Sequence, residues 1–379
     1  MKVMLVMNYA PDRQESMRRF GELLTRELPA LGVEPAVVAP VPRLGRLAPR
    51  YRYAGWPKYL GYADKFLLFP RQLRREIDRQ RPDVVHIIDH ANSTYARAAG
   101  RTPVLATCHD LLQIRAARGE FNGHRPGWAG RRLQRWILRE ISAVPDLACV
   151  SGKTEEDVNR LLPHPGPRTH LIPNGLNFPF APVPPSRARA RLRALAPGDW
   201  ADRDFYVNVG GGQWYKNRPG LLAIFAEICQ RVDPPPALVL VGKPLSAADR
   251  ERAVALGVAA HLVHLPNLPG YDLAACYSVA RGLIFPSWEE GFGWPVAEAQ
   301  ACGCPVFASD RAPLTEVGGT AAVYFDPAEP AGAADRIVAA RPREADLRER
   351  GLARAAEWAP QRMAAAYAKL YRQLAGHTA

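Results

Sequence analysis

Several features that would place a protein in a membrane or outside the cell are missing from this sequence of 379 residues. No uninterrupted apolar run approaches the roughly 20 residues that a helix needs to cross a bilayer. The opening MKVMLVMNYAPD has only a short apolar run before a proline, which predicts a first β-strand instead of a secretory leader. We therefore expect a cytoplasmic protein.

Metal-binding patterns are also scarce. Six cysteines are scattered along the chain, and only Cys302 and Cys304 lie close together, without a second pair to complete a zinc site. This spacing predicts reduced thiols in the core. The Asp-Arg-Asp at 202–204 precedes a predicted strand, whereas ligands in open α/β sheets collect after the strands. We expect neither a metal ion nor a cofactor.

The charge is strongly basic, yet no zinc finger, helix-turn-helix or RNA-binding aromatic signature accompanies it, so we expect no nucleic-acid partner. The net charge is +13. Residues 1–177 contain 28 Lys and Arg against 17 Asp and Glu, and the remainder contains 22 against 20. The excess concentrates in 43–81 and 115–139. Either the first half meets something anionic, an acceptor or a lipid surface, or the charge only keeps the protein soluble.

The length favours two domains. Short apolar runs alternate with amphipathic stretches in the first half, and the alternation restarts after a linker at 177–192 with four prolines in its first nine residues. Strands that alternate with helices indicate βαβ units and parallel sheets. We expect an α/β protein with two doubly wound Rossmann-like domains, 1–178 and 186–359, whose strand ends face a central cleft.

The segment SWEEGFGWPVAEAQACGCPV at 287–306 carries the most informative pattern. A glycine turn leads into a predicted helix, and backbone N–H groups around Phe292–Trp294 can face a diphosphate. Glu290, on the turn, could reach sugar hydroxyls, and Glu298 could accept hydrogen bonds from a ribose. A nucleoside diphosphate-sugar combines these features. A helix with solvated surface glutamates fits the spacing equally well.

Two other strand ends carry candidate residues. A strand runs into the glycines of YVNVGGGQWYKN, including Gly211 and Gly212, and then reaches Lys216 before a helix. Glycines let a backbone approach a phosphate, and the lysine adds a point charge, although such turns often only change the chain direction. The strand PVLATC ends at His109 and Asp110; a lone histidine is more often structural, but a strand end favours function.

Taken together, these segments resemble the retaining family-4 glycosyltransferases (glycosyl transferases group 1), which have the GT-B fold. CHDLLQI, VSGKTEEDV, IPNG, VGGGQWYKN, PSWEEGFGWPVAEAQACGCPV and LTEVGGTAAVYFDP occur in the family's order. The resemblance implies an acceptor-side first domain, a nucleotide-sugar-binding second domain and a final helix, 360–379, that packs back on the first.

The resemblance also implies a role for each candidate residue. Glu290 and His109 would be catalytic, beside the transferred sugar. Ser16 and Asp110 would lie on the acceptor side. The residues that would bind the donor are Gly211, Gly212, Lys216, Gly291, Phe292, Gly293, Trp294 and Glu298.

Some positions depart from the family's pattern. Glu15 and Ser16 stand where members commonly have two glycines near the donor phosphates. Tyr215 stands in place of an arginine beside the phosphate lysine, and Trp294 in place of a leucine. The Glu15-Ser16 departure removes the family's usual basis for expecting contact between the first domain and the donor phosphates.

The sequence thus predicts a metal-independent hexosyltransferase that moves a sugar, with retention, from a GDP- or UDP-sugar to a carbohydrate or lipid-linked acceptor in glycan or glycolipid synthesis. An anionic acceptor, or peripheral contact with the inner membrane face, would explain the basic half. The alternatives are a GT-B nucleotide-sugar epimerase or hydrolase and, from another class, a protein that binds an anionic polymer.

Overall fold

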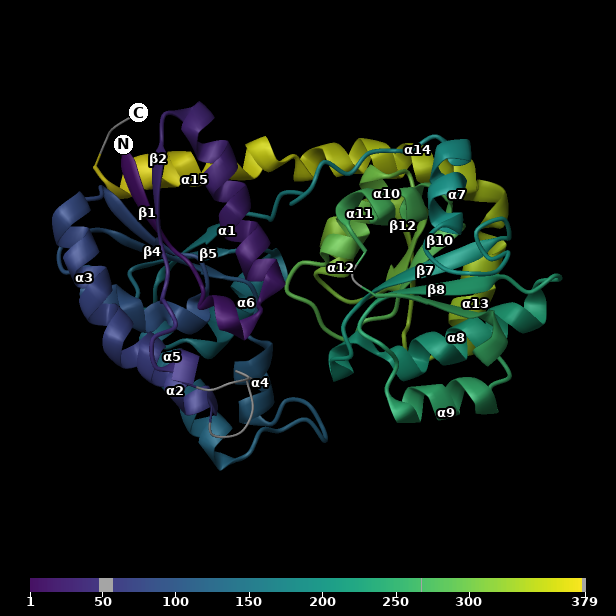
Figure 1. Cartoon of the computed structure of the whole chain (residues 1–379), viewed down its shortest axis with the longest axis horizontal. Helices are drawn as coiled ribbons and strands as arrows, with labels where there is room; N and C mark the ends of the chain where they lie inside the picture. The colour runs from purple at the N-terminus through teal and green to yellow at the C-terminus, as the bar shows by residue number, and fades with distance from the viewer. Residues whose placement is uncertain (48–56, 267, 377–379) are drawn as a thin grey trace. The chain divides into compact units, whose positions relative to one another are not determined.

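The computed structural model describes residues 1–47, 57–266 and 268–376. The chain folds into two compact units, Met1–Asn177 together with Pro360–Ala379, and Phe178–Ala359. Each unit contains one sheet of six parallel strands flanked by helices (Figure 1). The predicted α/β class, with two Rossmann-like domains, is confirmed. Among the described residues, no helix combines the length and the apolar character that crossing a bilayer requires.

The sheet of the first unit has the strand order β2-β1-β3-β4-β5-β6. Its strands are apolar because helices cover both faces of a parallel sheet; Val3–Val6 have no exposed surface. The strands are β1 (Lys2–Val6), β2 (Glu34–Val38), β3 (Val84–Ile87), β4 (Val104–Cys108), β5 (Asp146–Cys149) and β6 (Arg168–Leu171). The α-helices are α1 (Glu15–Glu27), α2 (Pro57–Ala63), α3 (Phe69–Gln80), α4 (Leu112–Arg118), α5 (Trp128–Ser142), α6 (Gly152–Leu161) and α15 (Pro360–Leu374).

The sheet of the second unit has the order β12-β11-β10-β7-β8-β9, so β7 and β10 are neighbours although 71 residues separate their ends, Gly210 and Gly282. The strands are β7 (Phe205–Gly210), β8 (Ala237–Gly242), β9 (Leu262–Leu265), β10 (Gly282–Phe285), β11 (Val306–Ser309) and β12 (Ala322–Phe325). The α-helices are α7 (Pro185–Arg193), α8 (Arg218–Arg231), α9 (Ala247–Ala255), α10 (Gly270–Val279), α11 (Trp294–Ala301), α12 (Leu314–Gly318), α13 (Pro330–Ala339) and α14 (Glu344–Ala355).

Helix α15 is joined to the first sheet by a buried polar chain. The imidazole of His86 lies between two hydroxyls, with Nδ1 2.7 Å from the Tyr371 oxygen and Nε2 2.7 Å from Thr107 Oγ1. Thr107 Oγ1 is also 3.0 Å from the Tyr367 oxygen. All four side chains are fully buried, so each hydrogen bond replaces water that cannot enter. The last helix of the chain therefore completes the core that the first strands begin.

The cysteines and the Asp-Arg-Asp segment at 202–204 have structural roles. All six cysteines are free thiols, and only Cys229 is not fully buried, as their spacing predicts. In the Asp-Arg-Asp segment, Asp202 pairs with Arg193 at 2.6 Å and Asp204 with Arg341 at 3.1 Å. Over the described ranges, no three His, Cys, Asp or Glu side chains are grouped so that they could hold a metal ion.

We predict that the buried imidazole of His86 makes the free energy of unfolding depend on pH. Burial lowers the pKa of His86 from 6.5 to about 3. The unfolded chain therefore binds a proton between these values that the folded chain does not, so stability is full above about pH 6.5 and falls below it. At pH 5 the loss is about 2 kcal/mol. Urea unfolding at pH 7 and pH 5 measures it.

The matched variants are His86→Gln and, as control, His164→Gln at an exposed site where Nε2 lies 3.1 Å from the Asn159 carbonyl oxygen. The first should reduce the difference between pH 7 and pH 5, and the second should leave it unchanged. Burial also lowers the pKa of His109, so some dependence remains in both. An unchanged pH dependence in His86→Gln would contradict the prediction.

Candidate active site

A glycine turn connects β10 with α11. Gly293 precedes the helix with φ 99, and a Cβ there would lie 2.6 Å from Leu314 Cδ2, so both the backbone conformation and the space require glycine. Gly293 offers no side-chain cap, and Pro295 occupies the first turn. The phenyl ring of Phe292 is 5% exposed and packs edge-on against Trp358 at 5.4 Å between centroids. The backbone of this turn, rather than the Phe292 ring, is therefore what a ligand can meet.

The predicted phosphate lysine and the predicted sugar carboxylate form an ion pair. Lys216 Nζ donates to Glu290 Oε1 at 2.6 Å, and the two side chains are only 18% and 9% exposed. The loops that carry them follow neighbouring strands and are joined again by the Trp288 N–H, which donates to the Tyr215 carbonyl at 2.7 Å. A charge-assisted bond with this little exposure is stronger than a surface pair. The structure thus brings two separately predicted residues together.

Glu298 lies in the interior, on the second turn of α11. Its side chain is part of a residue only 5% exposed, and Oε2 accepts a hydrogen bond from the fully buried Tyr277 hydroxyl at 3.3 Å. Burial, and then the nearby Glu298 carboxylate, raises the pKa of Tyr277. Since neither Glu290 nor Glu298 is solvated, the alternative of a helix with surface glutamates does not describe this segment.

The glycines after β7 have different surroundings. At Gly211, a Cβ would approach the flexible Gln213 side chain to 2.1 Å, whereas Gly212 has open space on that side. Their predicted role in phosphate approach stays a prediction. The 3-10 helix Trp214–Lys216 then leads to Asn217, whose side chain caps α8 by accepting from the Gly220 N–H at 3.1 Å.

One residue that the sequence did not single out, Arg218, fixes two of these strand ends. Its guanidinium donates to the carbonyls of Lys243 at 2.6 Å, Pro244 at 2.9 Å and Gly210 at 3.2 Å. At Gly242, with φ 118, a Cβ would lie 2.4 Å from the Gly210 carbonyl oxygen. The ends of β7 and β8 are therefore packed at backbone contact, and Arg218 holds them. Burial lowers the pKa of Arg218.

In the first unit, His109 directly follows β4 and is 6% exposed. Its Nε2 lies 2.8 Å from the Ile88 carbonyl oxygen, and its ring meets Phe20 edge-on at 4.8 Å between centroids. Since a carbonyl only accepts, Nε2 carries the proton and Nδ1 is an acceptor. Burial lowers the pKa of His109, so the ring is neutral near pH 7.

The two predicted acceptor-side residues have different positions. Asp110 Oδ1 accepts from the Leu112 N–H at 3.0 Å, two residues before α4 begins. Ser16 is exposed on the first turn of α1, where Glu15 pairs with Arg18. The structure gives Asp110 a structural bond, and among the described residues no hydrogen bond joins Ser16 to His109.

A polar network after β1 and β3 was also not predicted. Asn8 Nδ2 donates to Asp89 Oδ2 at 2.6 Å, and Asn92 Nδ2 donates to Asn8 Oδ1 at 3.0 Å. Asp89 and Asn92 are buried at the strand edge where His109 lies. Only their position directly after predicted strands could have indicated them.

Two parallel sheets of this topology define a GT-B protein. A solved structure with the same fold is sucrose-phosphate synthase from Thermosynechococcus elongatus, with a TM-score of 0.76, 20% identity and coverage of 100% of both chains. The sequence pattern described as Glycosyltransferase Family 4 matches residues 19–178, and that described as Glycosyl transferases group 1 matches 198–351. The chain belongs to the family-4 glycosyltransferases.

Two relatives with assigned names are similar over part of their length. D-inositol 3-phosphate glycosyltransferase from Salinispora tropica is 30% identical over 243 residues, 59% of this chain and 49% of that protein. GDP-mannose-dependent alpha-(1-6)-phosphatidylinositol monomannoside mannosyltransferase from Mycolicibacterium smegmatis is 30% identical over 242 residues, 61% of this chain and 59% of that protein. The chain thus spans about half to three-fifths of these relatives.

We predict that Arg218→Ala destabilises the protein, because the carbonyls of Gly210, Lys243 and Pro244 lose a charged donor. Such bonds contribute about 1.5–3 kcal/mol. The matched control is Arg231→Ala on the same helix, whose surface pairs with Glu227 and Asp335 should contribute about 1 kcal/mol or less. Urea unfolding at neutral pH compares the two. Equal losses would show that Arg218 has no special structural role.

Proposed function

We propose that this protein is a retaining glycosyltransferase that moves a hexose from a nucleoside diphosphate-sugar to an acceptor hydroxyl. The Lys216–Glu290 pair beside the glycine turn carries the proposal, because it sets a cation for a diphosphate next to a carboxylate for sugar hydroxyls. Family membership supports the reaction class. The name of the mycobacterial relative supports a GDP-sugar, and a UDP-sugar is the other donor to test.

The donor-binding part is assigned to the second unit. The diphosphate would take the place beside Lys216 Nζ and the N–H groups at the start of α11, including those of Gly291–Trp294. Glu298, held by the Tyr277 hydroxyl, would accept hydrogen bonds from the ribose. These groups supply positive potential without a divalent ion, so we expect transfer to continue in the presence of a chelator.

Retention follows from the proposed use of Glu290 as a binding group. A retaining hydrolase uses a carboxylate nucleophile with a second carboxyl about 5 Å away. Here Glu290 is neutralised by Lys216, and Glu298 is bonded inside the protein. We propose that the bond from the anomeric carbon to the diphosphate oxygen breaks while the acceptor oxygen bonds that carbon on the same face. The acceptor proton passes to the departing phosphate oxygen.

His109 is proposed as the sugar-contacting residue of the first unit. Because its Nε2 proton is used by the Ile88 carbonyl, Nδ1 would accept a hydrogen bond from a sugar hydroxyl. A neutral ring does this without adding a charge beside the reacting carbon. Asp110 and Ser16 remain the proposed acceptor-side residues at the start of α4 and α1.

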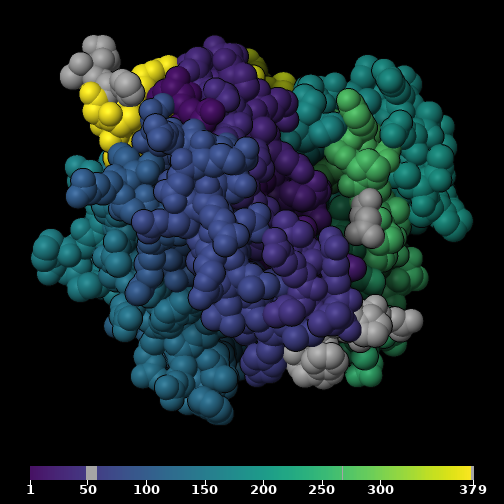
Figure 2. Space-filling model, turned by 60° about the vertical axis from the view of Figure 1, so that its left-hand side comes forward, coloured from purple at the N-terminus to yellow at the C-terminus, as the bar shows by residue number. Residues whose placement is uncertain are grey.

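The exposed part of the basic half is proposed to meet an anionic acceptor or the cytoplasmic membrane face. Lys65 does not contribute, because it is buried and pairs with Asp12 at 2.7 Å. Arg71, Arg74 and Arg75 are exposed on α3, near exposed Leu67. Helix α3 comes forward in the view of Figure 2. Residues 48–56 of the basic stretch lie outside the described residues.

We predict that Lys216→Ala weakens nucleoside diphosphate binding at least about tenfold, because a charge-assisted contact of roughly 1.5–3 kcal/mol is lost and Glu290 is left unpaired. Free nucleoside has no diphosphate and should bind as before. Calorimetric titration of both ligands, with GDP and UDP, measures this. Equal losses for nucleoside and nucleoside diphosphate would remove Lys216 from the phosphate site.

We predict that Glu290→Gln lowers mainly kcat, whereas Glu298→Gln lowers mainly donor affinity, since Glu298 lies farther along α11. Steady-state kinetics of both variants, with NMR of the product's anomeric linkage, measures this. An inverted product, or Glu290→Gln with full turnover, would contradict the mechanism. Release of free sugar without acceptor would identify a hydrolase instead.

For the membrane proposal, we predict that the double variant Arg71→Gln/Arg75→Gln weakens co-sedimentation with anionic vesicles. Each arginine near an anionic leaflet contributes about 1 kcal/mol, and salt screens it. The control is Arg336→Gln, at an exposed position of α13 in the second unit. Binding that is indifferent to lipid charge and to the double substitution would leave solubility as the role of this charge.

A further inference from the structure

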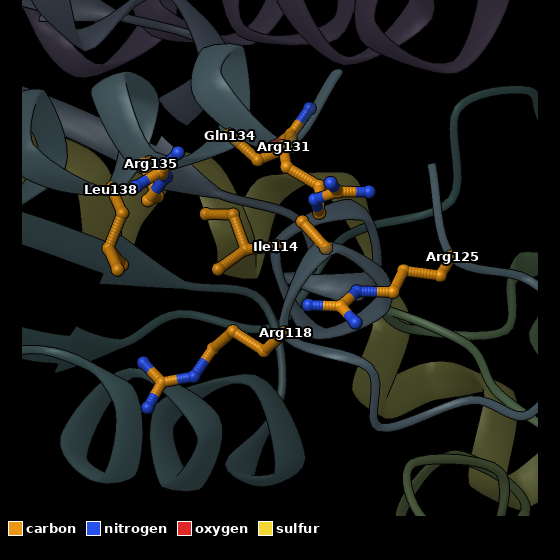
Figure 3. A pocket seen from close by; sticks show the side chains of 8 residues that line it. Ile114, Arg118, Arg125, Arg131, Gln134, Arg135 and Leu138 are labelled. Carbon is orange, nitrogen blue, oxygen red and sulfur yellow. The ribbon is translucent and has the colours of Figure 1, made fainter. Parts of the chain in front are cut away.

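A cavity of about 350 Å³ lies between α4 and α5, wholly within the first unit. Four arginines line it: Arg118 at the end of α4, Arg125 in the following loop, and Arg131 and Arg135 one turn apart on α5. In Figure 3 the guanidinium groups of Arg125 and Arg131 extend toward the same space beside Ile114. Its volume is within the range of small-molecule sites.

Local structure sets these cations around the cavity. Helix α4 ends at Gly119, whose φ of 85 turns the chain into the loop that carries Arg125. Arg131 Nη1 donates to the Pro126 carbonyl at 3.1 Å, which ties α5 to that loop. Arg131 and Arg135 are four residues apart and therefore share one face of α5.

The neighbouring carboxylates are already paired with other cations. Glu120 accepts from Arg115 and Arg160, each at 2.9 Å, and Asp157 accepts from Lys153 at 2.7 Å. Within residues 1–47, 57–266 and 268–376, none of the four cavity arginines forms a salt bridge with a carboxylate. Four like charges around one cavity repel each other, so a bound anion would be stabilised there.

Apart from Gln134, the remaining lining is apolar. Ile114 is 2% exposed and Ala117 8%, and Leu138 completes this side of the cavity. The planar guanidinium group of arginine matches the oxygens of a phosphate, and an apolar wall can pack against the carbon atoms attached to that phosphate. The lining therefore fits a phosphate ester better than a free inorganic ion.

The position in the fold agrees with a substrate role. Helix α4 begins three residues after His109, at the carboxyl end of β4, and its residues Ile114 and Ala117 line the cavity. In open α/β sheets, ligands bind outside the carboxyl ends of the strands. One wall of the cavity is thus formed by the helix that follows His109, the proposed sugar-contacting residue of the first unit.

We propose that this cavity binds the phosphate ester of the acceptor substrate, with Arg125, Arg131 and Arg135 as the phosphate-binding residues. The inference rests on the proposed transferase function and assigns the chemical class of its acceptor. A phosphorylated polyol and a phospholipid headgroup both carry this group, and the experiment distinguishes them.

The test compares Arg131→Gln/Arg135→Gln with a matched control, Arg132→Gln/Arg139→Gln, which removes two exposed arginines of the same helix that do not line the cavity. Glycerol 3-phosphate is titrated calorimetrically, and vesicles of phosphatidylglycerol in phosphatidylcholine are co-sedimented. We expect the cavity variant to weaken at least one probe tenfold or more, and the control to change it less than twofold.

Loss for glycerol 3-phosphate assigns a soluble phosphorylated acceptor, and loss for vesicles alone assigns a lipid-borne one. If neither probe depends on Arg131 and Arg135, or if the control loses as much, the proposal is overturned. Nucleoside diphosphate binding is measured in parallel on both variants and should be unchanged. Failure of the wild-type protein to bind any nucleoside diphosphate would instead overturn the proposed function.

Discussion

The short bond between the Lys216 ammonium and the Glu290 carboxylate joins the two loops on which the second unit's candidate site is built. The loops meet because β7 and β10 are adjacent in the sheet, and the Trp288–Tyr215 backbone bond holds them in register. Each charge satisfies the other in surroundings with little water. In the proposed complex, a phosphate that approaches Lys216 would share it with Glu290, and this would order the anionic and neutral ends of the donor.

The Lys216–Glu290 pair is more important because no arginine stands beside Lys216 in the sequence. Tyr215 stands at that position, and its ring centroid lies 5.7 Å from the lysine Nζ. Arg218 is close in sequence, but its guanidinium is committed to three backbone carbonyls. Lys216 is thus the side-chain cation that we propose for the diphosphate.

The sequence predicted the fold well because parallel strands buried on both faces appear as continuous apolar runs, as in Val3–Val6. Gly293 was also predictable, since a glycine before a helix start marks a turn with a special backbone conformation. Arg218 was not, because its partners are backbone carbonyls that carry no side-chain signature. The Asn8–Asp89–Asn92 network was missed because its first two members lie 81 positions apart in the sequence.

The cavity between α4 and α5 shows a similar limit. Composition indicated a basic stretch at 115–139, but not that Arg115 would be buried with Asp157 while Arg125 and Arg131 point into a common space. The sequence gives the number of cations in a stretch. Only the folded structure shows which of them form internal ion pairs and which remain available to a ligand.

Because α15 packs on the first sheet, the first unit is built from two separate parts of the chain. Since residues 178–359 lie between two parts of one compact unit, the second unit is an insertion within the first. A fragment that stops at residue 177 would expose the pocket that Tyr367 and Tyr371 fill beside His86. A self-contained first unit would need residues 1–177 spliced to 360–379, whereas the second could be excised whole at its two ends.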